Sequence, residues 1–180
     1  GYRTIDAGNG YGGSDETGFD LMEPMVKLFW EPNSDIYQRW EFKYGYSEFD
    51  ADETYAGLVE SDLKANPYRR YAGTFLDHMA TEHKRSYLKY LLEPSDNLTL
   101  QVAAYYNEFE RDWYKINKAG GQSVSKVVAD PLTYAAAYDD LRLLGTGSLG
   151  IKHNSRAYES KGFQFNFDYD TTIGGTEHSI

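Results

Sequence analysis

Cysteine is absent from this sequence, which excludes disulfide bonds and thiol chemistry within it and leaves the compartment open. No run of apolar residues approaches the roughly eighteen that a membrane-spanning helix needs, so such a helix is excluded as well. Basic residues are scarce, with 18 Lys and Arg against 28 Asp and Glu, and they form no basic stripe. The resulting net charge of −10 argues against a nucleic-acid partner.

The sequence also lacks the signatures of common enzymes, because it contains no nucleophile motif, phosphate-binding loop or dinucleotide fingerprint. Glu108 with Glu110, or Asp139 with Asp140, could be imagined as a glycosidase pair, but paired acids in a chain this acidic are usually solvated. The histidines are far apart and show no metal-ligand spacing: His78, His83, His153 and His178. We therefore predict that the protein is not an enzyme, has no cofactor and holds no metal directly.

What the sequence does contain is a marked two-residue alternation. In residues 36–48 the odd positions are mostly polar, and the even positions are mostly apolar or aromatic: Ile36, Trp40, Phe42, Tyr44 and Tyr46. This pattern is typical of a β-strand with one apolar and one polar face. It is longer than an average strand of about five or six residues and matches the roughly nine to eleven residues of a tilted strand that crosses a bilayer.

Similar patterns predict further strands at 19–30, 83–92, 98–109 and 157–169. Pro24 lies within the first of these and belongs at a rim, because proline donates no ladder hydrogen bond. The turn-forming sequences EPNSD (31–35) and EPSDN (93–97) join neighbouring strands into hairpins. A moderate turn is expected at 170–178.

The other connections are long and polar. Residues 1–18 are rich in glycine and predict a loop. The connection 49–82 is expected to contain one helical turn at 61–64, which ends before Pro67. The connection 110–154 predicts a helix with Asp130 as its cap, Pro131 at its first position and Gly145 as its stop, and four of its residues would share a face: Tyr134, Tyr138, Leu141 and Leu144.

Short turns that alternate with long loops are typical of a bacterial outer-membrane barrel. The 17 tyrosines fit this interpretation, because Tyr and Trp are favoured where apolar surface meets water. The mean hydropathy of −0.66 does not exclude it, since alternating strands hide half of their apolar signal from such an average. We therefore expect an all-β fold, an antiparallel transmembrane β-barrel segment with long extracellular loops, one of which carries a short helix.

Two segments carry a family resemblance: residues 50–83, DADETYAGLVESDLKANPYRRYAGTFLDHMATEH, and residues 96–116, DNLTLQVAAYYNEFERDWYKI. They resemble the barrel of TonB-dependent outer-membrane receptors, of the branch that includes ferric dicitrate and siderophore receptors. The closing residues 174–180 are similar to the turn that precedes a late strand of such barrels, and residues 156–170 to the strand before it. The resemblance spans nearly all of residues 18–180.

The resemblance implies a barrel of about twenty-two antiparallel strands, plugged by an N-terminal domain, in the bacterial outer membrane. Such a receptor binds a ferric chelate at its extracellular face and imports it with energy from the TonB complex. Residues 1–180 would form a partial barrel domain of a longer polypeptide, because Gly1 is no initiator and the plug is missing from this sequence. The implied partners are the chelate, outer-membrane lipid and, through parts absent here, the TonB complex; iron travels within the chelate.

Ferric chelates such as dicitrate are anionic, so their sites should collect Arg and Tyr. The candidates lie in two groups, one in the first long connection and one at the start of the second: Tyr68, Arg69, Arg70 and Tyr71, then Arg111, Trp113 and Tyr114. The alternative for the first group is that its arginines neutralise neighbouring acids while its tyrosines pack loop on loop. The residues alone leave both interpretations open, and similar barrels carry cobalamin, other metal chelates or saccharides.

A function of another class also fits the composition, namely a soluble β-rich carbohydrate-binding or glycoside-hydrolase module whose exposed Tyr and Trp stack on sugars. The two hypotheses differ in where the aromatic face of residues 36–48 points. A soluble sandwich turns Trp40, Phe42 and Tyr44 into a dry core, whereas a membrane barrel exposes them to lipid.

Overall fold

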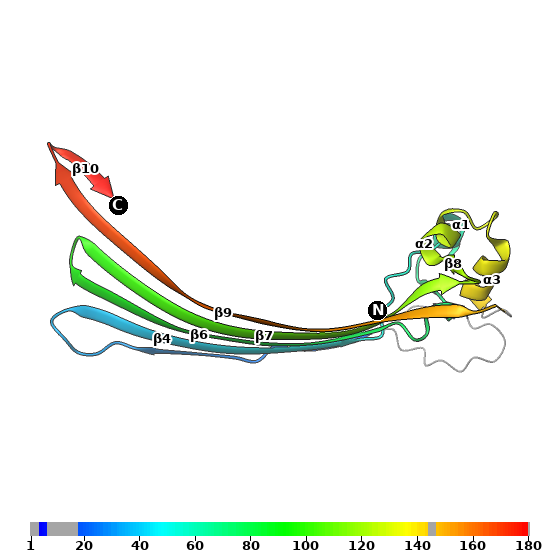
Figure 1. The fold of residues 1–180 in the computed structure, drawn as a ribbon, viewed down its shortest axis with the longest axis horizontal. Helices are drawn as coiled ribbons and strands as arrows, with labels where there is room; N and C mark the ends of the chain where they lie inside the picture. The colour runs from blue at the N-terminus through cyan, green and yellow to red at the C-terminus, as the bar shows by residue number, and fades with distance from the viewer. Residues whose placement is uncertain (1–3, 7–17, 144–146, 180) are drawn as a thin grey trace. The chain divides into compact units, whose positions relative to one another are not determined.

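The computed structural model describes residues 4–6, 18–143 and 147–179, and it is mostly antiparallel β-sheet (Figure 1). The chain divides into two compact units. The loop unit comprises Gly1–Leu21, Phe49–Thr81 and Arg111–Arg156, and the sheet unit comprises Met22–Glu48, Glu82–Glu110 and Ala157–Ile180. Within the described ranges no helix is long and apolar enough to cross a membrane.

Long strands dominate the structure, and the main sheet has the order β10-β9-β7-β6-β4-β2, with β3 also paired to β4. The strands are β2 (Phe19–Met22), β3 (Met25–Trp30), β4 (Tyr37–Ala51), β6 (His78–Ser95), β7 (Leu98–Ala119), β9 (Leu149–Ile173) and β10 (Thr176–Ser179). Among the described residues this sheet is open rather than closed into a barrel. The predicted antiparallel β class is confirmed, with a few short helices, whereas the predicted barrel stays a prediction.

The hairpin predicted around residues 31–35 is confirmed by the antiparallel register of β3 and β4. Trp30 lies opposite Trp40, and Leu28 opposite Phe42, so the apolar residues of both strands share one face. Pro24 separates β2 from β3, as expected of a residue that cannot donate to the ladder.

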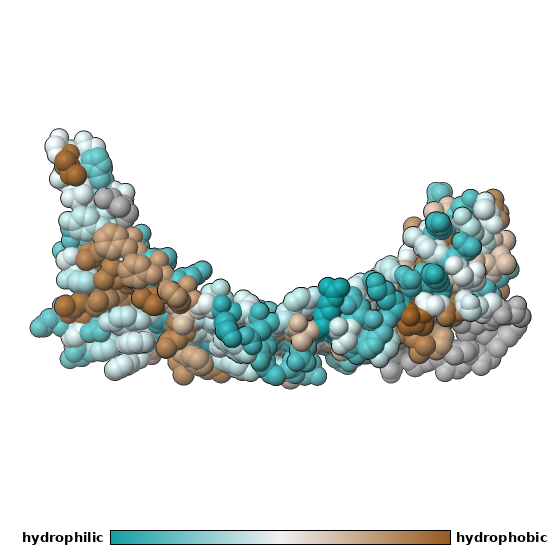
Figure 2. All heavy atoms as spheres, in the orientation of Figure 1, coloured by the Kyte–Doolittle hydropathy of each residue, from teal (hydrophilic) through white to brown (hydrophobic). Residues whose placement is uncertain are grey.

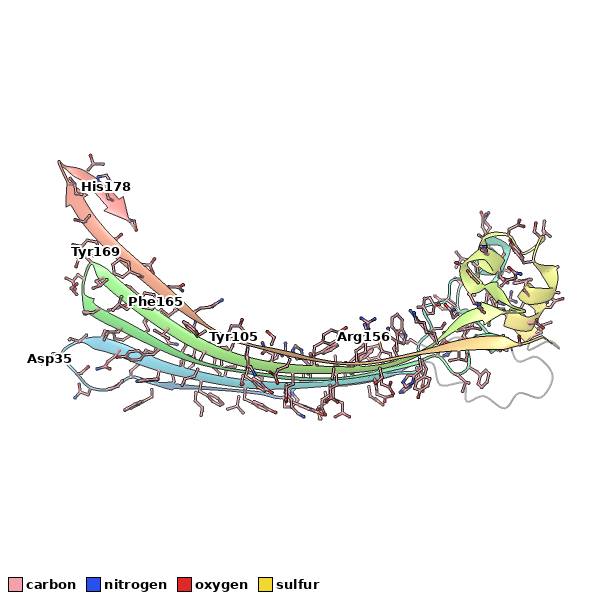
Figure 3. The ribbon with its side chains drawn as sticks, in the orientation of Figure 1. Asp35, Tyr105, Arg156, Phe165, Tyr169 and His178 are labelled. Atoms are coloured by element: carbon pink, nitrogen blue, oxygen red, sulfur yellow. The ribbon has the colours of Figure 1, made fainter. Side chains whose placement is uncertain are left out.

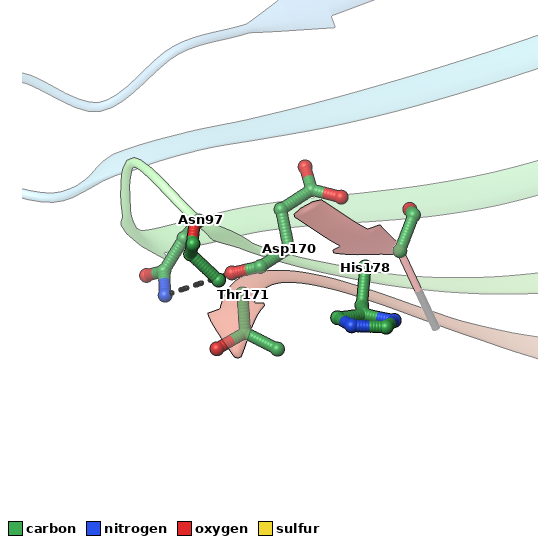
Figure 4. A pocket seen from close by; sticks show the side chains of 6 residues that line it. Asn97, Asp170, Thr171 and His178 are labelled. Carbon is green, nitrogen blue, oxygen red and sulfur yellow. Dashed lines mark hydrogen bonds between the residues drawn. The ribbon is translucent and has the colours of Figure 1, made fainter. Parts of the chain in front are cut away.

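The second predicted turn, expected at 93–97, is limited to Asp96 and Asn97, because β6 continues to Ser95 and β7 begins at Leu98. Two hydrogen bonds connect Asn97 to β9. The Asp170 N–H donates to the Asn97 carbonyl at 2.9 Å. Asn97 Nδ2 donates to the Asp170 carbonyl at 3.2 Å (Figure 4). The turn expected at 170–178 is shorter than predicted, because β9 continues to Ile173 and only Gly174 and Gly175 separate it from β10. Their φ values of 62° and 84° are readily adopted by glycine.

The predicted strand ends were wrong in the long connections. β6 begins at His78 rather than at 83, β7 continues to Ala119 rather than 109, and β9 begins at Leu149 rather than at 157. These extensions carry polar residues on both faces, so hydrophobic alternation does not mark them. Residues 4–6 were expected in a loop but form β1 (Thr4–Asp6), which pairs in parallel with β5 (Arg69–Tyr71).

The buried core lies in the loop unit, where the remaining short elements pack together. They are α1 (Glu60–Ala65), the 3-10 turn η1 (Ala72–Thr74), β8 (Gln122–Ser123), α2 (Val124–Ala129) and α3 (Ala135–Leu143). Ile116, Val127 and Leu141 are completely buried at its centre. Gly73 allows η1 to approach α3 closely, because a Cβ at this position would lie 2.6 Å from the Leu141 carbonyl oxygen.

The helices differ in part from the prediction. The turn expected at 61–64 is present as α1, but the helix expected to start after Asp130 begins only at Ala135. Asp130 instead ends α2, a helix that the sequence did not predict, and its carboxylate accepts the Thr133 N–H at 3.1 Å. The predicted stop Gly145 and Leu144 lie outside the described residues.

The sheet unit has no comparable core. Its described residues contain neither a helix nor a second layer of strands, and large apolar side chains on one face are exposed, including Leu28 at 58%, Phe165 at 59% and Phe42 at 40%. Figure 2 shows a hydrophobic area gathered on this unit near its turns, and Figure 3 shows Phe165 and Tyr169 on β9 in that region. The aromatic face is thus not turned into a dry protein core.

Candidate ligand-binding site

The first predicted group of ligand-binding residues, Tyr68 to Tyr71, lies at β5 in the loop unit, but its members are placed differently. Tyr68 is 66% exposed, whereas Arg70 and Tyr71 are 3% and 1% exposed. Arg69 is partly buried, and its Nη1 contacts the Asp62 carboxylate at 2.6 Å. Of these four residues, Tyr68 therefore presents the most side-chain surface to a ligand.

Arg70 is held by atoms of the loop unit itself. Its Nε donates to Thr74 Oγ1 at 2.9 Å and its Nη2 to the Thr74 carbonyl at 2.6 Å, while Nη1 donates to the Asp52 carbonyl. These bonds connect β5 to η1 and to the residues after β4. In this conformation Arg70 stabilises the loop unit, and its predicted role in ligand binding stays a prediction.

Tyr71 and Arg69 meet at the buried carboxylate of Asp62. One oxygen accepts the Tyr71 hydroxyl at 2.7 Å and the Tyr138 hydroxyl, and the other accepts Arg69. Burial alone would raise the pKa of the Asp62 carboxyl, but the hydrogen bonds from Tyr138 and Tyr71 and the charge of Arg69 lower it below its ordinary value. This group therefore matches the alternative in which arginines neutralise neighbouring acids and tyrosines pack between loops.

The second predicted group leads to a more open cluster of cations and aromatic rings. Lys115 Nζ lies 3.7 Å from the centroid of the Trp113 ring and 4.7 Å from that of Tyr55. The Arg111 guanidinium lies 5.5 Å from the Trp113 centroid, and the rings of Tyr55 and Trp113 meet edge to face at 5.8 Å. We call these four residues, Tyr55, Arg111, Trp113 and Lys115, the Trp113 cluster.

The strand geometry of β7 builds most of this cluster. Residues 111, 113 and 115 point to the same face because side chains alternate along a strand. Sequence reasoning missed Lys115, since β7 was expected to end at 109, and its two-residue spacing from Trp113 was the available signal. It also missed Tyr55, which lies far away in the sequence and enters the cluster through the fold.

The base of the Trp113 cluster is fixed by a buried acid. Tyr55 donates its hydroxyl to the Ile116 carbonyl at 2.6 Å, and the Ile116 N–H donates to the Asp77 carboxylate, which also accepts the Thr54 hydroxyl. Burial raises the pKa of the Asp77 carboxyl although these donors oppose the shift. Burial, followed by the nearby Asp77, also raises the pKa of the Tyr55 hydroxyl, so Tyr55 remains a neutral donor at physiological pH.

Tyr114, the remaining candidate, lies on the opposite face of β7. Its ring stacks on His153 with centroids 3.9 Å apart and planes 7° from parallel, and His153 also pairs with the Asp112 carboxylate. The structure therefore brings Arg111 and Trp113 together and directs Tyr114 elsewhere.

The Trp113 cluster combines two cations with two aromatic rings. Its two cations lie near aromatic faces, an arrangement that favours a positive charge and leaves donor groups for an anion. Arg111 Nε is buried and, among the described residues, has no hydrogen-bond partner. Within the same described ranges no group of three or more His, Cys, Asp or Glu side chains could hold a metal ion.

Comparisons were made with models of protein families, with curated proteins and with solved structures. None of these comparisons gives a match to this chain.

Proposed function

We propose that this chain forms part of the wall and outer loops of a transmembrane β-barrel in the bacterial outer membrane. The observation that carries the proposal is the exposed apolar face of the sheet unit, which has no covering layer among its described residues. Each such Phe or Leu left in water would lack the stabilisation of about 1.5–3 kcal/mol that burial of its side chain provides. A bilayer supplies that burial, and strand pairing satisfies the backbone polar groups that lipid cannot.

We propose further that the barrel is a receptor that binds a ferric chelate, a siderophore or ferric dicitrate, and imports it with TonB-coupled energy. The resemblance of residues 50–83 and 96–116 to such receptors supports this assignment. The Trp113 cluster supports it independently, because its guanidinium and ammonium groups match the carboxylates of an anionic chelate.

The membrane part of the proposal is tested by labelling neighbouring residues of β9. Because this chain contains no cysteine, Phe165→Cys and Asn166→Cys can each carry a spin label in the full-length protein, with any cysteine elsewhere replaced. We expect the Phe165 label to be relaxed by oxygen, which concentrates in lipid, and the Asn166 label by a water-soluble nickel chelate. Equal exposure of both labels to the nickel chelate in reconstituted liposomes would refute the membrane wall and favour a soluble module.

The receptor part is tested by uptake and binding of radiolabelled ferric chelates in cells that carry the full-length gene. Lys115→Ala and Trp113→Ala are expected to weaken binding about tenfold or more, which corresponds to about 1.4 kcal/mol. Lys126→Ala removes the same charge from an exposed position of α2 and serves as the matched control. The proposal is refuted if Lys115→Ala and Lys126→Ala have the same affinity.

A further inference from the structure

The polar face of the sheet unit contains a groove apart from the Trp113 cluster. The volume of this groove is about 560 Å³.

The groove is formed by residues of β3, β4, β6 and β7 together with Glu23, and its lining includes Lys43, Gly45, Arg85, Tyr105 and Asn107. Its volume lies within the range of about 300–1,000 Å³ that is usual for small-molecule sites. The lining combines apolar and polar surface and includes two cations and one carboxylate, that of Glu23, which accepts the Ser47 hydroxyl at 3.2 Å.

These two cations differ from Lys27 and Arg39, which share one carboxylate partner. Lys27 lies 2.9 Å from the Glu41 carboxylate, and Arg39 lies 3.4 Å from it. Among the described residues, Lys43 and Arg85 have neither an ion pair nor a hydrogen bond. In a chain with a net charge of −10, this groove therefore has two cations without an ion pair against one carboxylate, that of Glu23.

Arg85 lies close to the backbone of β4 at Gly45. Gly45 lines the groove and is buried, and a Cβ at this position would be in ordinary van der Waals contact with Arg85 Nε, at 3.9 Å. A Cβ at Gly162 would lie 2.8 Å from the Tyr105 hydroxyl oxygen, so the Tyr105 ring packs against the backbone of β9. Figure 3 shows Tyr105 on its strand. The groove therefore has a planar cation on one wall and a positioned phenol on another.

We infer that this groove binds a small polycarboxylate anion, with Arg85 as the bidentate partner of one carboxylate and Lys43 as the partner of a second. The planar guanidinium matches a carboxylate through two parallel hydrogen bonds, whereas an ammonium group acts as a point charge. Asn107 and the Tyr105 hydroxyl supply neutral donors. The role of the groove as a second binding site for an anionic chelate rests on the proposed function, but the binding of the anion does not.

The test is isothermal titration calorimetry of the purified full-length protein with iron-free citrate. Arg85→Gln and Lys43→Gln are each expected to weaken citrate binding at least tenfold. Lys84→Gln is the matched control, because it removes a cation from the adjacent position of β6, which points to the opposite face. The heat-induced unfolding of each variant is compared with that of the parent protein, and two independent variants keep the test valid if one does not fold.

The outcomes separate this inference from the proposed function. Citrate binding that survives Trp113→Ala but is lost with Arg85→Gln supports the groove even if no ferric chelate is imported. Absence of citrate binding, or equal affinities of Arg85→Gln and Lys84→Gln, overturns it. Inorganic phosphate that binds as tightly as citrate overturns the assignment to carboxylates.

Discussion

Replacing Asp62 by alanine is expected to loosen the loop unit more than any exposed substitution. The carboxylate accepts hydrogen bonds from Arg69, Tyr71 and Tyr138. Hydrogen bonds to a charged group contribute about 1.5–3 kcal/mol each, but these three share one acceptor and are not additive. In the variant, the partly exposed Arg69 can hydrogen-bond to water, whereas the buried Tyr71 hydroxyl is left without its acceptor. We therefore expect the free energy of opening of the loop unit to fall by about 3–5 kcal/mol.

The assay is amide hydrogen exchange, which reports the free energy of local opening. The informative amides are Leu63, which donates to the Val59 carbonyl at 2.9 Å, and Asn66, which donates to the Asp62 carbonyl at 2.8 Å. Lys64→Ala is the control, because it removes an exposed pair with Glu60 and should cost less than about 0.5 kcal/mol. If both variants change exchange equally, the buried network does not stabilise this unit.

The same variant carries a pH prediction. Burial alone would raise the folded-state pKa of Asp62, but the hydrogen bonds from Tyr138 and Tyr71 and the charge of Arg69 lower it overall. The ionised carboxylate therefore stabilises the fold above the unfolded-state pKa of about 4. That contribution is lost as the pH falls through the lower, folded-state pKa. The difference in opening free energy between the parent protein and Asp62→Ala should therefore shrink below about pH 4; a difference that grows on acidification would contradict the assignment.

Two further substitutions test the packing of each unit. Gly73→Ala places a Cβ 2.6 Å from the Leu141 carbonyl oxygen, so we expect it to lower the free energy of local opening of α3 by about 1–3 kcal/mol, as measured by hydrogen exchange. Gly57→Ala is the control and should be nearly neutral, because no atom lies within 4 Å of a Cβ at that position. Phe165→Arg should reduce the amount of protein assembled in the outer membrane, because an arginine on the lipid face costs about 2–4 kcal/mol at the midplane. Asn166→Arg should not reduce it. Equal assembly of the two variants would argue against a lipid-facing β9.

Alternation predicted the strands of the sheet unit well because only one of their faces is apolar. The register of Trp30 with Trp40 follows from the turn between them and from that shared face. The same signal failed at the strand ends. Beyond residue 109, β7 reads ERDWYKINKA, in which both faces carry polar groups, so hydrophobicity no longer reveals a strand that backbone pairing maintains.

The candidate site was only partly predictable for a related reason. Residue type identified Arg70 and Trp113 equally well as candidates, but it cannot show which cation has found an internal partner. Arg70 contacts Thr74 and the Asp52 carbonyl through the fold of the loop unit. Tyr55 reaches Trp113 from another connection, so no local spacing reveals their contact.

The excess of acids makes unpaired cations the most informative feature of this chain. With 28 acidic and 18 basic residues, carboxylates outnumber the cations available to pair with them. The Asp62 carboxylate accepts hydrogen bonds from two tyrosines besides Arg69, and the Asp77 carboxylate accepts them from Thr54 and a backbone N–H. A cation without a carboxylate partner is therefore a notable exception in this chain. Removing such a cation should cost little stability but should weaken the binding of an anion. This reasoning predicts that Arg85→Gln changes affinity without changing the unfolding temperature, the opposite of what Asp62→Ala should do.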